Sequence, residues 1–116
     1  MTETIIITEK ITKKELEKIA KKRFGDMIKG VIDIHTKELA LGGELHADQE
    51  AILIENGNNQ NDLWGINIYI NDTFPENIEF DSVINIRPSQ NNRSRNVENP
   101  QLQHQIIKIL SHLLDI

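Results

Sequence analysis

The fold is decided by residues 28–43, which read IKGVIDIHTKELALGG. In the first half of this stretch one face carries isoleucines and a glycine at every second position, a period typical of a half-buried strand. After a turn near Thr36-Lys37 the alternation resumes at Leu39 and Leu41 and ends at two glycines. We therefore predict a β-hairpin whose second strand ends or bulges at the glycines.

Three further segments have strand character. Residues 64–70 alternate from a tryptophan through three isoleucines, and residues 78–86 alternate until Pro88. Proline removes a backbone donor and ends a strand. The β-branched run at residues 5–7 predicts another short strand or an extended lead-in.

A first helix is predicted from about Lys13 to Arg23. Thr12 precedes Glu15 by three residues, which is the spacing of a capping box. Apolar residues then follow at helical intervals until Gly25, where we expect the helix to stop.

Two more helices follow from local end signals. Asp48 is expected to cap a short helix that leaves through Asn56-Gly57 in a left-handed conformation. Asn99 and Pro100 are expected at the start of the last helix. That helix carries a wide apolar stripe at Leu102, Ile106, Ile109, Leu110, Leu113 and Leu114.

These elements predict a single α+β domain over residues 1–116. Its sheet would be mainly antiparallel, with about four to five strands and helices packed on one face. The stripe of the last helix either covers this sheet or serves a homodimer. We expect it to cover the sheet, because a domain of 116 residues needs every apolar face that it has.

Composition excludes several classes of protein. The chain is 38% hydrophobic, with no cysteine and no apolar run long enough for a membrane span, so no membrane partner is expected. The start at Met1-Thr2-Glu3 has no basic region followed by an apolar stretch, which predicts no secretory signal and a cytoplasmic location.

Charge is distributed unevenly along the chain. Residues 10–29 hold eight lysines or arginines against three acids, whereas residues 30–81 hold eleven acids against one lysine. The basic first helix could face its own acidic middle, or it could meet an acidic partner such as nucleic acid. An aromatic content of 4% and a net charge of -5 make a nucleic-acid partner less favoured.

The strongest candidate site is the donor-rich segment that follows residues 78–86. Guanidinium and amide groups bind carboxylate or phosphate in directional pairs, so an anionic small molecule is a suitable guest. Alternatively the segment is solvated, or Arg87 pairs with an internal acid. The candidate ligand-binding side chains here are Arg87, Ser89, Gln90, Asn92, Arg93 and Arg95.

Two neighbouring sets could extend this site. Glu44, His46 and Asp48 are spaced by two, so on an extended chain they would share a face and could hold a metal or do acid–base work. If Asp48 caps the helix, the trio breaks up. The spacing matches no zinc pattern, so we assign no metal, and Glu44 and His46 join the candidate ligand site. Asn67 and Asn85 could line a pocket beside Arg87 if their strands are neighbours.

Several longer strings carry a resemblance. They are Arg23–Met27 (RFGDM), Gly42–Asp48 (GGELHAD), Leu63–Asn67 (LWGIN) and Phe80–Arg95 (FDSVINIRPSQNNRSR). Together they resemble a family of uncharacterised proteins, a domain of unknown function found in cyanobacteria and other bacteria. The resemblance implies no activity, substrate or cofactor. It leads us to expect glycine at position 91, where this chain has Asn91.

Three classes of function stay open from the sequence. The favoured hypothesis is a binding domain for an anionic small molecule; the others are a nucleic-acid contact protein and a structural or partner-interaction domain. The sequence contains no nucleophile motif, phosphate loop or dinucleotide fingerprint, so it assigns neither an enzyme activity nor a cofactor.

Overall fold

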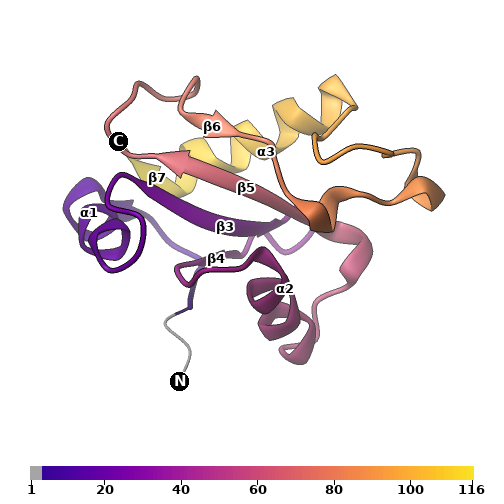
Figure 1. The fold of residues 1–116 in the computed structure, drawn as a ribbon, viewed down its shortest axis with the longest axis horizontal. Helices are drawn as coiled ribbons and strands as arrows, with labels where there is room; N and C mark the ends of the chain where they lie inside the picture. The colour runs from indigo at the N-terminus through magenta and orange to yellow at the C-terminus, as the bar shows by residue number, and fades with distance from the viewer. Residues whose placement is uncertain (1–3) are drawn as a thin grey trace.

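The computed structural model describes residues 4–116 (Figure 1). Short 3₁₀ helices connect the main elements at η1 (Gln60–Asp62), η2 (Val83–Asn85) and η3 (Pro88–Gln90). The α-helices are α1 (Lys13–Lys21), α2 (His46–Glu55) and α3 (Pro100–Leu113). The strands are β1 (Ile5–Ile7), β2 (Ile11–Thr12), β3 (Met27–Asp33), β4 (Leu39–Leu41), β5 (Leu63–Tyr69), β6 (Ile78–Glu79) and β7 (Leu114–Asp115).

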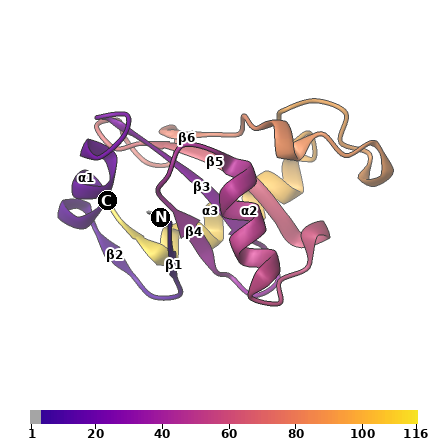
Figure 2. The same ribbon diagram turned by 60° about the horizontal axis from the view of Figure 1, so that its bottom comes forward.

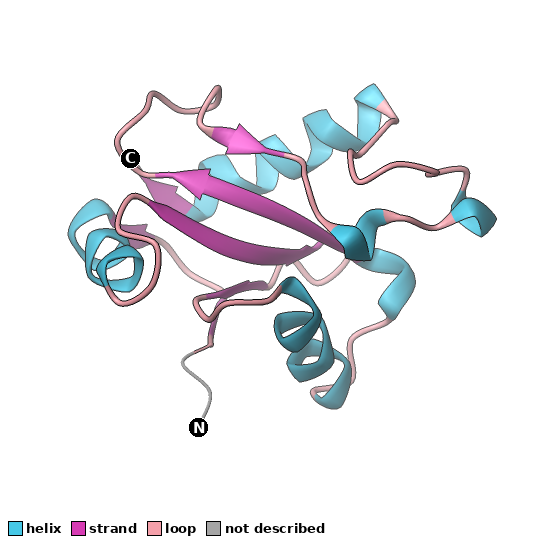
Figure 3. Ribbon diagram, viewed as in Figure 1, coloured by secondary structure: helices cyan, strands magenta, loops and turns pink. Residues whose placement is uncertain are grey.

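The strands form one main sheet and one small pair. The main sheet has five antiparallel strands in the order β1-β4-β3-β5-β6, and its centre is the seven-residue pairing of β3 with β5. β2 and β7 pair in parallel, with Ile11 opposite Leu114. The predicted α+β class and the predicted hairpin of residues 28–43 are therefore confirmed (Figure 3).

The helices lie on both faces of the sheet rather than on one. The apolar side chains of α1 and α3 join the main core with Ile28, Ile32 and Ile66. Leu53 of α2 instead belongs to a smaller core with Val31 and Ala40, whose side chains leave the opposite face of their strands. Figure 2 shows α2 in front of the sheet and α3 behind it. The second face needs its own cover because it also carries apolar residues.

The apolar stripe of α3 packs against the sheet of the same chain. Ile106, Ile109, Leu110 and Leu113 are all buried in the main core, so the last helix covers the sheet as expected. At 14 residues α3 is the longest helix, and no helix within residues 4–116 has the length and apolar character needed to cross a membrane.

Both termini of the first helix follow their sequence signals. Thr12 Oγ1 accepts the Glu15 amide and the Glu15 carboxylate accepts the Thr12 amide, so the capping box is present. The chain turns at Gly25, whose φ of +86° is accessible to glycine and whose amide donates to the Ala20 carbonyl.

The start of α2 differs from its prediction. Leu45 is the N-cap and no side chain caps the helix, so Asp48 lies in the first turn instead. There its carboxylate interacts favourably with the positive end of the helix dipole. The left-handed exit at Gly57, with φ +96°, is confirmed. The predicted start of α3 is also confirmed, because Asn99 Oδ1 accepts the Gln101 amide ahead of Pro100.

The predicted strand over residues 78–86 is wrong beyond Glu79. After β6 the chain reaches η2, where the buried Asn85 side chain pairs with Gly65 of β5. The Gly65 amide donates to Asn85 Oδ1 at 2.8 Å, and Asn85 Nδ2 donates to the Gly65 carbonyl at 3.0 Å. The carboxamide thus makes the hydrogen bonds that a neighbouring strand would have made, and the backbone of this segment is free to coil.

Gly65 makes this approach possible. A Cβ at position 65 would lie 2.5 Å from Ser82 Cβ, closer than real contacts allow. We expect Gly65→Ala to lower the free energy of unfolding by about 1–3 kcal/mol through overpacking, as measured by urea denaturation. The cost should shrink in a Ser82→Gly background. An equal cost in both backgrounds would show that this contact is not the cause.

Candidate functional site

Arg87 is bound by its own chain. Its guanidinium stacks on the Trp64 ring at 4.3 Å, donates through Nε to the Ile84 carbonyl at 3.1 Å and through Nη1 to the Gln60 carbonyl at 2.8 Å. Nη2 donates to the carbonyl of Leu63, the first residue of β5. Burial lowers the pKa of Arg87 from its ordinary value, but an arginine stays protonated at neutral pH. The side chain closes the sheet edge beside Asn85.

The buried Asn92 side chain ties together the backbone of the donor-rich segment by hydrogen bonds. Its Nδ2 donates to the carbonyls of Asn85 at 2.6 Å and Asn96 at 2.7 Å, and its Oδ1 accepts the Glu98 amide at 2.8 Å. The backbones of Asn92 and Arg87 form an isolated antiparallel bridge. Asn91 closes the turn with φ +61°, a conformation that glycine or asparagine adopts most easily.

The other candidate side chains of this segment are also distributed around the loop. Gln90 donates to the Asn61 carbonyl and accepts from Arg87. Arg95 pairs with Asp81, with Nε 2.6 Å from Oδ1. Ser89 and Arg93 are exposed to solvent. The structure therefore brings Arg87, Gln90 and Asn92 together around chain carbonyls, and their donors do not converge on an open space.

Two arginines of this segment provide a matched comparison. We expect Arg87→Ala to destabilise the fold by about 2–3 kcal/mol, because it removes charged hydrogen bonds to three backbone carbonyls and the stacking on Trp64. Arg93→Ala should change the free energy of unfolding by less than about 0.5 kcal/mol, since the side chain is exposed. Urea denaturation followed by tryptophan fluorescence measures both. Similar losses in the two variants would contradict this assignment.

The trio Glu44, His46 and Asp48 is not brought together. His46 begins α2 and is 7% exposed, with Nε2 2.8 Å from the Ile66 carbonyl, so this nitrogen carries the proton and donates. Glu44 lies outside the helix and pairs with Arg23 at 3.4 Å. Within residues 4–116 no three or more histidine, aspartate or glutamate side chains form a group that could hold a metal ion.

His46 gives the fold a pH dependence. Burial lowers its pKa below the ordinary 6.5, partly offset by the hydrogen bond to Ile66. The stability that the neutral ring contributes is complete above about pH 6.5 and falls as the pH decreases, because the unfolded chain then binds a proton that the fold excludes. We expect the free energy of unfolding to decrease from about pH 7 to about pH 5 more steeply in the native chain than in His46→Gln. Parallel pH curves from urea titrations would contradict this.

The four segments that carry the family resemblance contact one another. Arg23 pairs with Glu44, the His46 ring contacts the Ile66 carbonyl, and Asn67 Nδ2 donates to the Asp81 carbonyl. Asn67 also donates to Glu79, so it does not line a pocket with Asn85 and Arg87. These motifs form a connected structural network.

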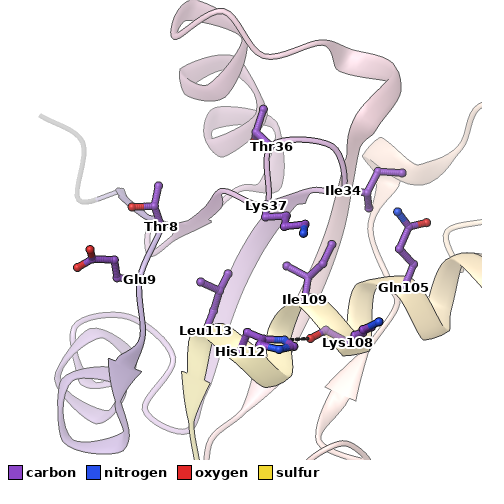
Figure 4. A pocket seen from close by; sticks show the side chains of 10 residues that line it. All are labelled: Thr8, Glu9, Ile34, Thr36, Lys37, Gln105, Lys108, Ile109, His112 and Leu113. Carbon is purple, nitrogen blue, oxygen red and sulfur yellow. Dashed lines mark hydrogen bonds between the residues drawn. The ribbon is translucent and has the colours of Figure 1, made fainter.

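A groove lies between α3, the turn after β3 and the chain that joins β1 to β2 (Figure 4). Its volume is about 590 Å³. Ile34, Ile109 and Leu113 form its apolar floor. The polar lining consists of Thr8, Glu9, Thr36, Lys37, Gln105, Lys108 and His112.

A buried aspartate fixes the turn that carries Lys37. Asp33 Oδ1 accepts the amides of His35 at 2.7 Å and Thr36 at 2.9 Å, and Asp33 Oδ2 accepts from Asn58 Nδ2 at 2.7 Å. Lys37 itself has φ +67°, and its amide donates to the Asp33 carbonyl at 2.8 Å. Left-handed backbone is unfavourable for a lysine, yet this turn holds it and directs the side chain over Ile109 (Figure 4).

The sequence prediction missed the groove. Lys108 and His112 are spaced by four on α3, and each directly precedes an apolar residue of the groove, Ile109 and Leu113, a signal visible in the sequence. Lys37, however, comes from a turn about seventy residues earlier, and only the folded chain brings it beside them.

The fold and the groove define a small α+β domain with a cationic groove over an apolar floor. The chain belongs to the family described as a protein of unknown function (DUF5674), whose model matches residues 5–113. This confirms the resemblance to a family of unknown function. No curated protein and no solved structure matches the chain.

Proposed function

We propose that this domain binds a small organic anion in the groove beside α3. The observation that carries the proposal is the direction of Lys37, which a locked turn holds over an apolar floor. Pockets for small molecules are commonly 300–1,000 Å³, with mostly apolar walls and a few placed polar groups. A volume of about 590 Å³ lies in this range, and Ile34, Ile109 and Leu113 supply the apolar part of a lining that is otherwise polar.

The charges of the groove favour a negative guest. Lys37 and Lys108 line it from opposite elements, and Glu9 is the acidic side chain of its lining. Two lysines against one glutamate give the lining a net single positive charge, with His112 not counted. Because hydrogen bonds to Asp33 already order the backbone of the turn, this backbone loses little further conformational entropy when a ligand binds to Lys37.

The proposed ligand class agrees with the hypothesis drawn from the sequence, but the proposed location differs. Arg87, Gln90 and Asn92 already spend their donors on carbonyls of the chain, so an anion there would have to displace those bonds. Glu44 and Arg95 are paired with Arg23 and Asp81. The groove offers cationic side chains beside an accessible volume.

Lys37→Gly separates binding from stability. Glycine adopts the positive φ without strain, so we expect a free energy of unfolding within about 1 kcal/mol of the native chain. The loss of one ammonium should weaken anion binding about 2–5-fold. A thermal-shift panel of carboxylates, sugar phosphates and nucleotides, run on both proteins, measures this. Arg93→Ala is the control and should bind like the native chain.

Two other outcomes would favour the other classes of function. If no anion raises the melting temperature, the binding proposal fails, and a structural or partner-interaction domain is favoured. If DNA or RNA gives a gel shift that weakens with salt, the exposed lysines of α1 become the contact surface. A cytoplasmic location stays a prediction from the sequence.

A further inference from the structure

We infer that the ligand of the groove is a monocarboxylate with an apolar body and a hydroxyl or amide donor, and that His112 accepts this donor. The inference rests on the proposed function and adds the chemistry of the ligand. It follows from the kind of cation in the groove, the end of α3 that lines it, and the hydrogen bond that orients the His112 ring.

The cations and the helix favour one negative charge over two. The groove has two lysines, and its lining from α3 begins at Gln105 and continues to Leu113, the last residue of the helix. The carbonyl end of a helix has a partial negative charge, which attracts the Lys108 ammonium but repels a dianion such as a phosphate monoester more strongly than a monoanion. With Glu9 also in the lining, the net charge matches a single carboxylate.

The floor requires an apolar ligand body. Ile109 and Leu113 are 7% and 5% exposed, and with Ile34 they offer only hydrocarbon to whatever lies on them. A carboxylate with an alkyl or aromatic body places its charge near Lys37 and covers the apolar surface that these side chains leave open. That surface is small on Ile109 and Leu113, so its burial at about 25 cal/mol per Å² makes a modest contribution.

The ring of His112 is oriented by the backbone of its own helix. Nδ1 lies 2.8 Å from the Lys108 carbonyl, which can only accept, so Nδ1 carries a proton. The Ser111 hydroxyl donates to the same carbonyl at 2.6 Å. In the neutral ring the other nitrogen, Nε2, then has a free lone pair. His112 lines the groove from α3, across the floor from Lys37, and its Nε2 lone pair is the acceptor that we assign to the ligand donor (Figure 4).

Matched six-carbon probes test the inference on the full chain. Hexanoate, 3-hydroxyhexanoate, 6-hydroxyhexanoate, hexyl phosphate and 1,6-hexanediol are titrated separately while amide NMR signals are recorded. We expect the carboxylates to move the signals of Lys37, Ile109 and Leu113, and the diol to move them much less. At least one hydroxylated acid should bind about 2–10-fold more tightly than hexanoate, the effect of one added hydrogen bond. Hexyl phosphate should bind no more tightly than hexanoate.

Variants of His112 separate its role from that of the charge. His112→Leu should lose the preference for the hydroxylated acid, measured as the ratio of its dissociation constant to that of hexanoate in the same variant, and His112→Gln, which keeps an acceptor, should retain part of it. Failure of every hydroxylated acid to bind more tightly, a preference that survives in His112→Leu, or tighter binding of the phosphate would overturn this inference alone. If no anion moves the groove signals, the proposed function fails with it.

Discussion

The structure depends on how the outer edge of β5 is closed. β6 pairs with β5 at only two positions, Asn67 with Glu79 and Ile68 with Ile78. Beyond them, the Asn85 carboxamide takes both backbone groups of Gly65. A carboxamide resembles a peptide group, with one acceptor and one donor side by side, so it continues the pairing where no strand is present. Without it, buried peptide groups in the longest strand pair would have no partner, a cost of several kcal/mol.

This edge explains why a polar loop of many donors is ordered. Fixing each residue of a loop costs about 1–2 kcal/mol of entropy, so a well-defined loop needs compensating interactions. Here the compensation comes from within the molecule: Arg87 covers the next carbonyl of β5, and Asn92 ties the return of the loop to Asn85. A cluster of arginine and asparagine in a sequence is therefore as compatible with backbone satisfaction as with recognition of an anion.

Sequence reasoning succeeded where the determinant is local. The capping box at Thr12 and the left-handed exit at Gly57 are each set by one or two residues, and both were predicted. It failed at Asn85, because alternating apolar residues cannot reveal that a side chain replaces a strand. The groove was missed for a related reason: Lys37 and His112 belong to separate parts of the chain, and only tertiary structure joins them. Local signals predict elements, whereas sites assembled from distant segments require the fold.

The parallel pairing of β2 with β7 has a consequence for synthesis of the protein. Ile11 lies opposite Leu114, so the two partners are separated by almost the whole sequence. A chain emerging from the ribosome cannot form this pair until Leu114 has been synthesised and has emerged, and contacts of such separation also slow folding in general. Ile11 is buried in the folded protein. During translation the region around Ile11 therefore has no strand partner until Leu114 is available.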